Sequence, residues 1–318
     1  MTRPGVRSVT AGGVALALRV ICRRLGRVAA VVNAGPENHF PALPGVRVLH
    51  VTDDWPAGAD LMGLDRDRIV SVLRANVRAA DLVCGVTPAL VDTVVDLAPG
   101  PRQTLVLPNG TRAISPAPGE HRPADLPDGP FALVVGQLNE RLDLELLTAV
   151  AAYGTDLVLL GPRTERDPAV TRALDALIAA PRVRWLGRRP QEDLDRYLRA
   201  ASVGLTPYAV NAFNRASFPL KSLEYLAAGL PVVSTDLEAT RWLATDLITT
   251  ASTPARFAAA VRAAVATPPD PALADRRREF AGRHSWVVRA ADLEDRISSV
   301  TPTGRRLSPA SSRPAARC

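Results

Sequence analysis

Short runs of apolar, β-branched residues alternate with helix-forming segments through most of this chain. Between residues 131 and 250 the strand candidates are FALVVG, DLVLLGP, VRWLG, VGLTPY, PVVSTD and LITT, and helix-forming sequence follows each of the first four. A helix between two strands carries the chain back to the starting end of the sheet, so consecutive strands pair in parallel. The pattern predicts a doubly wound α/β sheet, in which ligands bind at the carboxyl ends of the strands.

The first part of the chain carries the same alternation in a shorter form. Strands are predicted over residues 28–33, 47–52, 81–87 and 103–108, and helices over 13–26, 65–80 and 87–97. Residues 108–130 are rich in Pro and Gly, which is typical of a connection between domains. Because 318 residues exceed what one hydrophobic core usually serves, two α/β domains are predicted.

Basic charge is concentrated at the two ends of the chain. Residues 1–30 contain six Arg and residues 301–318 contain four, and neither segment contains an acidic residue. The rest holds 29 basic against 32 acidic side chains, so the body is not basic although the net charge is +7. This distribution argues against nucleic acid as a partner and makes the ends candidates for contact with anionic lipid head groups. Residues 301–318, rich in Ser, Pro and Arg, are predicted to be disordered.

The cysteines and the apolar segment near the start limit the compartment. Cys22, Cys84 and Cys318 show no metal-binding spacing, and such sparse usage fits a reduced cytoplasm. The apolar stretch before Arg19 is too short to span a bilayer, and no clean signal-cleavage site follows it. We therefore expect a cytoplasmic location, with peripheral association at the inner membrane face as an option.

Lys221 is the single lysine among 39 basic residues, all others being Arg. Its surroundings predict a helix, with Ser217 as the cap, Pro219 in the first turn and Gly229 just beyond the end. A helix N-terminus with a lysine in its first turn is suited to an anion, and Glu224 lies on the same face three residues on. The same spacing also fits an ordinary surface ion pair.

Five segments, in order, resemble a GT-B glycosyltransferase of the large retaining group often called family 4, or glycosyl transferases group 1. They are LVLPNG, VVGQLNERLDLELL, VRWLGRRPQEDLDRYL, TPYAVNAFNRASFPLKSLEYLAAGLPVVST and HSWVVRAADLEDRI. The resemblance runs from about Val46 to Val300. It implies two Rossmann-like domains: a shortened acceptor-side domain over 1–115, a nucleotide-sugar domain over 116–285, a helix over 286–300 that crosses back to the first domain, and the tail 301–318.

The resemblance also implies where the donor binds. Glu224 would accept the ribose hydroxyls, and Lys221 with nearby backbone amides would bind the diphosphate. The implied donor-binding residues are Gly136, Arg141, Gly187, Arg188, Ser217, Phe218, Pro219, Leu220, Lys221 and Glu224. For Arg141 a solvated arginine at a helix start is an equal alternative, and for Gly187 with Arg188 a plain turn.

The sequence departs from the family pattern at two places. Many members carry a second glutamate eight residues before the ribose one, where this chain has Ala216. Few residues precede the VTDDW segment, so the first domain is expected to be reduced or the start misplaced. Asp53 and Asp54 follow a predicted strand and are the acceptor-side candidates, with an Asp-rich turn as the alternative. We interpret His50 as a strand residue, and Trp55 as a residue that stacks on a sugar or lies in the core.

Together these features predict transfer of a sugar from a nucleotide diphosphate sugar to a hydroxyl acceptor, either a saccharide or a lipid-linked one. Retention of the anomeric configuration is implied by the resemblance, with Asp53, Asp54 and Lys221 in the catalytic set. No metal site and no cofactor beyond the donor are expected, because the sequence shows no carboxylate cluster. A non-catalytic nucleotide-sugar-binding scaffold is the alternative, and an epimerase of the same fold is a third.

Overall fold

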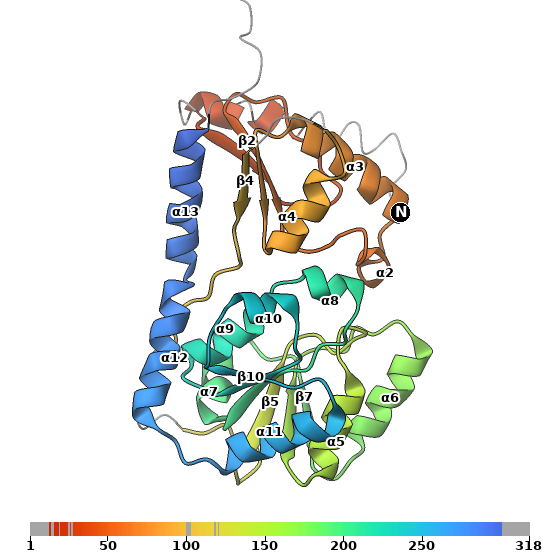
Figure 1. Ribbon diagram of the computed structural model, residues 1–318, viewed down its shortest axis with the longest axis vertical. Helices are drawn as coiled ribbons and strands as arrows, with labels where there is room; N and C mark the ends of the chain where they lie inside the picture. The colour runs from red at the N-terminus through yellow and green to blue at the C-terminus, as the bar shows by residue number, and fades with distance from the viewer. Residues whose placement is uncertain are drawn as a thin grey trace, which may run out of the picture.

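The computed structural model describes residues 28–99, 103–117 and 121–300, with positions 13, 16–18, 20–24, 26 and 119. Two α/β domains are stacked along the long axis of the molecule, and a long helical arm runs down one side of both (Figure 1). The described residues between 16 and 24 are helical, in agreement with the helix predicted there. The tail predicted to be disordered, 301–318, lies outside the described residues.

The first domain is built on a parallel sheet with the strand order β1-β2-β3-β4. Its strands are β1 (Ala30–Asn33), β2 (Val46–Val51), β3 (Leu82–Gly85) and β4 (Gln103–Val106), and its helices are α2 (Ala59–Met62), α3 (Arg66–Ala79) and α4 (Pro88–Val95). Asp65 caps α3 and Thr87 caps α4, each by accepting a hydrogen bond from a backbone N–H three residues on. One face of the sheet packs Leu49 and Val51 into a core shared with α3 and α4.

The second domain has a six-stranded parallel sheet in the order β10-β9-β8-β5-β6-β7. Its strands are β5 (Phe131–Val135), β6 (Asp156–Leu160), β7 (Val183–Gly187), β8 (Val203–Thr206), β9 (Val232–Ser234) and β10 (Ile248–Thr250). The chain leaves β5 toward β6 on one side and later returns to β8 on the other. A crevice therefore opens at the carboxyl ends of β5 and β8, where ligands bind in sheets of this topology.

Helices cover both faces of this second sheet (Figure 1). They are α5 (Leu144–Ala152), α6 (Pro168–Ile178), α7 (Leu194–Ala200), α8 (Ala212–Ala216), α9 (Leu220–Ala227), α10 (Glu238–Trp242) and α11 (Pro254–Ala266). Helices α5, α6 and α7 follow β5, β6 and β7, where helix-forming sequence is predicted, and Gly229 lies just past α9 with φ +84°, as a left-handed helix stop requires. The capping prediction for α9 is wrong: Pro219 is its N-cap, and Ser217 ends α8 instead.

The helical arm of Figure 1 connects the two domains, and consists of α12 (Pro271–Arg283) and α13 (Trp286–Ser299). α12 packs on α9, while Leu293 and Ile297 of α13 pack against the first sheet. The arm meets the interdomain connection where Thr111 donates its N–H to the His284 carbonyl (2.9 Å) and accepts from the Trp286 N–H (3.2 Å). The two segments that pass from one domain to the other are thus hydrogen-bonded to each other.

Tyr225 fixes α9 on the sheet. Its ring lies directly over Gly204 of β8, where a Cβ atom would come within 2.1 Å of the ring. Its hydroxyl oxygen accepts a hydrogen bond from the Val135 N–H at the end of β5 (2.8 Å). Tyr225 is fully buried, so this oxygen satisfies a backbone donor that water cannot reach.

Replacing Tyr225 by Phe should therefore destabilise the protein without creating a cavity. The Val135 N–H would remain buried without an acceptor, which costs about 1–3 kcal/mol. Urea unfolding of Tyr225→Phe measures the loss, with Tyr153→Phe on the exposed end of α5 as the control. Equal unfolding free energies for the two variants would contradict the anchoring role of the hydroxyl group.

Candidate functional site

Three adjacent strands of the second sheet end in glycine. Gly136, Gly161 and Gly187 follow or close β5, β6 and β7 with φ values of +150°, +152° and +66°. A Cβ atom on Gly161 would lie 1.8 Å from the Gly136 carbonyl oxygen, so only glycine fits there. A Cβ atom on Gly136 or Gly187 would meet nothing within 4 Å. The backbone at Gly136 and Gly187 therefore faces open space that a ligand could enter.

A small cavity at this edge brings together three of the predicted donor residues. It has a volume of about 130 Å³ and is lined by Gly136, Arg141 and Lys221, with Tyr208 and Pro207 from the segment after β8. The residues come from the loop after β5 and from the start of α9, which meet at the crevice of the sheet. The predicted juxtaposition of glycine turn, arginine and lysine is present in the fold.

Lys221 and Glu224 form an ion pair along one face of the first two turns of α9. The Lys221 Nζ and the Glu224 Oε2 are 2.6 Å apart, and about a quarter of each side chain is exposed. Pro219 offers no side-chain acceptor to the first-turn amides of this helix. The positive end of α9 and a lysine ammonium thus face the cavity together, with a carboxylate beside them.

Few backbone amides at positions 218 to 220 are free to bind a diphosphate. Pro219 has no N–H, and the Leu220 N–H is bonded to the Phe218 carbonyl (2.8 Å). No described residue accepts from the Phe218 N–H. The Phe218 ring itself is buried and packs edge-on against Trp242, with 6.3 Å between ring centroids. Of the three positions, only Phe218 offers a free amide.

Arg141 lies between two aromatic rings at the wall of the cavity. Its guanidinium carbon is 5.2 Å from the Tyr208 ring centroid and 4.9 Å from the Phe213 centroid. Its Nε donates to Asn214 Oδ1 (3.1 Å). The sequence analysis did not identify Asn214 or the five-residue helix α8. The sequence signal for this helix is Asn211, its N-cap. Arg141 is therefore built into the site and is not a loose arginine at a helix start.

The acceptor-side candidates Asp53 and Asp54 have different hydrogen-bond partners in the structure. The Ser217 hydroxyl, from the second domain, donates to Asp53 Oδ1 (3.2 Å). Asp54 accepts from the Ala57 N–H (3.0 Å) within its own turn, which is the turn role that the sequence left open. Trp55 is buried in the core of the first domain. Asp53 is thus the carboxylate at the contact between the domains.

Burial raises the pKa of Asp53 above its usual value, and the positive charge of Arg141 and the Ser217 hydrogen bond oppose that shift. The Arg141 charge acts from the second domain, across the interface. Burial also lowers the pKa of His50, on strand β2 just before Asp53, so a neutral imidazole is favoured there.

Gly187 and Arg188 lie outside the cavity that holds Arg141 and Lys221. The Gly187 carbonyl accepts from the Gly161 N–H (2.9 Å), and the Arg188 side chain is exposed. Their predicted contact with a nucleobase stays a prediction.

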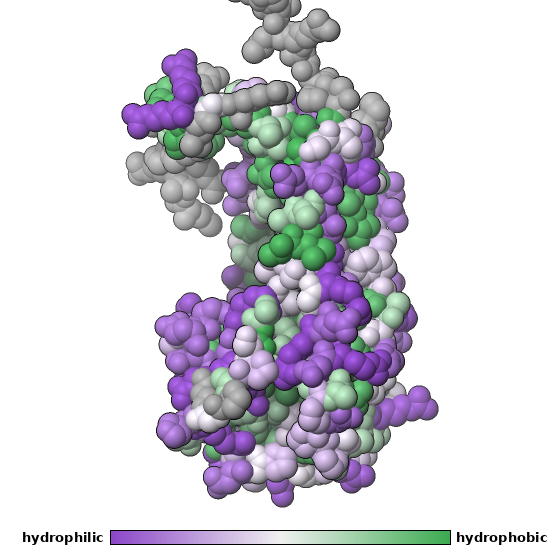
Figure 2. Space-filling model, turned by 90° about the vertical axis from the view of Figure 1, so that its left-hand side faces the viewer, coloured by the Kyte–Doolittle hydropathy of each residue, from purple (hydrophilic) through white to green (hydrophobic). Residues whose placement is uncertain are grey.

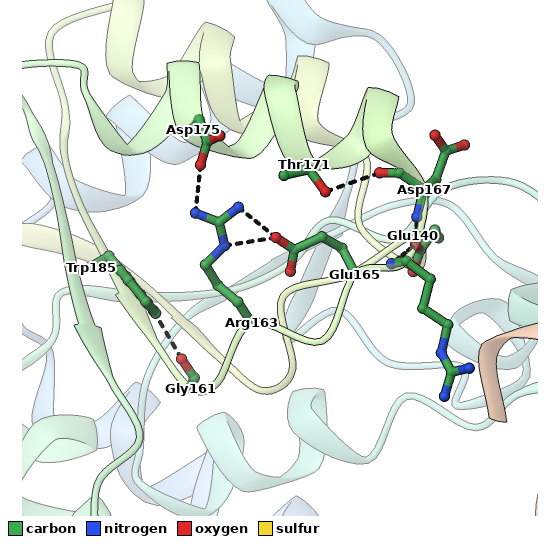
Figure 3. Close-up of polar contacts among 9 residues, drawn as sticks. Glu140, Gly161, Arg163, Glu165, Asp167, Thr171, Asp175 and Trp185 are labelled. Atoms are coloured by element: carbon green, nitrogen blue, oxygen red, sulfur yellow. Dashed lines mark hydrogen bonds and ion pairs between the residues drawn. The ribbon is translucent and has the colours of Figure 1, made fainter. Parts of the chain in front are cut away.

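The loop after β6 is braced beside the same edge (Figure 3). Arg163 bonds Glu165 and Asp175, and Trp185 of β7 donates its indole N–H to the Gly161 carbonyl (2.9 Å). Glu140, from the loop after β5, accepts from the Arg166 and Asp167 amides. Burial alone would raise the pKa of Glu140, but these hydrogen bonds lower it below its usual value. The two loops that frame Gly136 are therefore joined to each other.

Among the described residues, no group of three or more His, Cys, Asp or Glu side chains is placed to hold a metal ion. In the same part of the chain, no helix has both the length and the apolar character needed to cross a membrane.

Residues 130–267 match the family model described as Glycosyl transferases group 1. The putative teichuronic acid biosynthesis glycosyltransferase TuaH of Bacillus subtilis (strain 168) is 32% identical over 108 residues, 33% of this chain and 26% of TuaH. The match thus spans about a quarter of that relative's length.

Solved structures resemble the whole arrangement of domains. Sucrose-phosphate synthase from Thermosynechococcus elongatus superposes with a TM-score of 0.61 at 21% identity, covering 81% of this chain and 68% of that one. Anabaena HepE in complex with UDP-glucose gives 0.61 at 18%, covering 80% and 73%. WaaG, a glycosyltransferase involved in lipopolysaccharide biosynthesis, gives 0.61 at 17%, covering 88% and 80%.

The chain has the GT-B fold. The segment that matches the group 1 model, residues 130–267, contains the cavity with Gly136, Arg141 and Lys221. The solved structures agree with the two-domain fold that the sequence resemblance implied.

The raised pKa of Asp53 predicts a pH-dependent stability effect. A raised native pKa means that the folded protein is favoured when Asp53 is protonated, so this contribution is lost as pH rises through the native value. Asp53→Asn should raise the melting temperature at pH 7, and the gain should shrink as pH falls through the raised native pKa and be gone below about 4. Asp128→Asn, on an exposed loop, is the control. A lower melting temperature for Asp53→Asn at pH 7 would contradict the assignment.

Proposed function

We propose that the protein transfers a sugar from a nucleotide diphosphate sugar to a hydroxyl group of an acceptor, by the retaining and metal-independent chemistry of family 4. The observation that carries the proposal is the cavity at the β5–β8 crevice, where Lys221, Arg141 and the start of α9 bring positive charge to one small space beside Gly136. A diphosphate leaving group gains negative charge as its bond to the sugar breaks. Groups already fixed at that position stabilise the transition state more than the ground state.

In this proposal Lys221 contacts the diphosphate and Glu224 contacts the ribose hydroxyls. The Lys221 Nζ and the Glu224 Oε2 are 2.6 Å apart. Donor binding would exchange that ion pair for a contact of Lys221 with phosphate and of Glu224 with hydroxyl groups, so neither charge is left without a partner. No cofactor other than the donor is invoked.

Asp53 is the proposed acceptor-side residue, as a carboxylate that orients the acceptor hydroxyl. It is placed beside Ser217 at the interdomain contact, and Arg141 acts on its charge. Asp54 is assigned to the turn and not to the reaction, because its carboxylate already accepts the Ala57 amide.

Substitution of Lys221 should abolish most of the transfer activity. Lys221→Ala removes a positive charge that stabilises the leaving diphosphate in the transition state, which should lower the rate about a hundredfold. Lys221→Arg should also be impaired, because a planar guanidinium does not replace a compact ammonium in a small pocket. Glu224→Ala should weaken binding of the donor. Donor hydrolysis and transfer, measured with UDP-glucose and a panel of other nucleotide sugars, give the test.

Arg262→Ala, on the exposed surface of α11, is the control for loss of one positive charge. If Lys221→Ala and Glu224→Ala bind the donor as the unaltered chain does, the site assignment is wrong. A chain that binds nucleotide sugar and never turns it over, with saccharide or lipid-linked acceptors present, is the non-catalytic scaffold.

We further propose a saccharide or lipid-linked acceptor of cell-envelope polysaccharide synthesis, met by peripheral association with an anionic membrane. TuaH, named for teichuronic acid biosynthesis, supports the first part. Three observations support the second. The two basic end segments contain ten Arg and no acid. Val300 lines an apolar pocket of about 970 Å³ together with Cys22 and Ile297. On the face that carries the helical arm, hydrophobic residues gather mainly over the first domain (Figure 2).

Binding to vesicles tests the membrane proposal. The full chain should sediment with phosphatidylglycerol-containing vesicles and not with pure phosphatidylcholine, and salt should release it. Replacing Arg305 and Arg306 by Gln should weaken binding by about fivefold per arginine. Gln at Arg256 and Arg262, exposed on α11, is the matched control. Equal binding of both double variants would contradict the role of the basic end.

A further inference from the structure

Asn214 is a buried polar residue whose side chain makes two of its three hydrogen bonds to Arg141. Its side chain is 1% exposed and lies on the short helix α8. The amide Nδ2 donates to the Arg141 carbonyl (3.0 Å) and to the Ala209 carbonyl (2.8 Å). Its Oδ1 accepts from Arg141 Nε (3.1 Å). One amide group therefore holds both the backbone and the side chain of Arg141.

These contacts leave the far end of Arg141 for a ligand. Tyr208 and Phe213 hold the guanidinium between their rings, and Asn214 satisfies Nε. No described residue accepts a hydrogen bond from the two terminal nitrogens of Arg141. Arg141 lines the same cavity as Lys221. The free edge of a fixed guanidinium has the geometry that binds two oxygens of a phosphate group at once.

We infer that Asn214 is a positioning residue, which fixes Arg141 so that its terminal nitrogens meet the diphosphate of the donor. The inference rests on the proposed function. A free arginine side chain loses much conformational freedom when it binds, and an arginine already held in place loses less. An aspartate would fit the space but would neutralise the guanidinium and offer no donor to the two carbonyl groups.

The first domain contributes to holding α8 in place. A Cβ atom on Gly58 would lie 2.4 Å from the Phe213 ring, so the ring packs directly on the turn after Asp54. The Thr87 hydroxyl donates to the Ala216 carbonyl (3.1 Å) at the end of α8. The helix that positions Arg141 is therefore supported from both domains.

A double-mutant cycle on the full chain tests the inference. The probes are uridine diphosphate and uridine monophosphate, with guanosine and adenosine diphosphates as alternatives if the uridine nucleotides do not bind. Asn214→Leu should lower diphosphate affinity about tenfold, the effect of one hydrogen bond to a charged group, and should change monophosphate affinity less. Arg141→Ala should do the same. Asn214→Leu should have no further effect on diphosphate affinity when Arg141 is already Ala.

Two further variants separate positioning from folding. Asn211→Ala removes the cap of α8, so it should lower the melting temperature while the preference for diphosphate is kept. Asn214→Asp keeps the size of the side chain and should lose diphosphate affinity through charge neutralisation, which serves as the test if Asn214→Leu does not fold.

The inference is overturned by unchanged diphosphate affinity in Asn214→Leu, by additive losses in the double variant, or by an equal loss in Asn211→Ala. Failure of the proposed function looks different, because the unaltered chain would then bind none of the nucleoside diphosphates.

Discussion

The packing of the Tyr225 ring on Gly204 determines where the charged groups of the site lie. β8 carries glycine at that position because any side chain would overlap the ring. The ring brings α9 close enough for its hydroxyl oxygen to accept the Val135 N–H at the end of β5. Gly136 follows Val135 directly, so one contact sets both the helix that carries Lys221 and the turn that faces it. A shift of α9 along the sheet would separate the two walls of the cavity.

The two cations of the cavity are prepared in different ways. Lys221 is paired with Glu224 on its own helix and must exchange partners before it can bind an anion. Arg141 is held by aromatic rings and by an uncharged amide, so its terminal nitrogens need no such exchange. The ammonium of a lysine sits on a flexible stem and can change partners, whereas a guanidinium held by uncharged groups keeps one orientation. The site thus combines one cation that adapts to the ligand with one that is oriented in advance.

Much of the fold follows from local sequence, because strand and helix periods and caps act over a few residues. Asp65, Thr87 and Asp143 cap helices that the sequence predicts, and Gly229 ends α9 as expected. Ser217 shows the limit of such reasoning: its sequence context is that of a cap, but its hydroxyl group bonds Phe213 and Asp53 instead. Asp53 is 164 positions away in the chain, so no local pattern contains that contact. Asn214 escaped prediction for the same reason, since its partner Arg141 is 73 positions away.

The contact between Ser217 and Asp53 connects the two sides of the proposed reaction. Asp53 belongs to the first domain, and its charge is made costly by burial and less costly by Arg141 and Ser217 of the second. When a diphosphate neutralises Arg141, that support weakens, and the pKa of Asp53 should rise further. Release of the diphosphate would reverse the change. In the proposed reaction, the proton affinity of Asp53 is therefore coupled to occupancy of the donor cavity through one arginine.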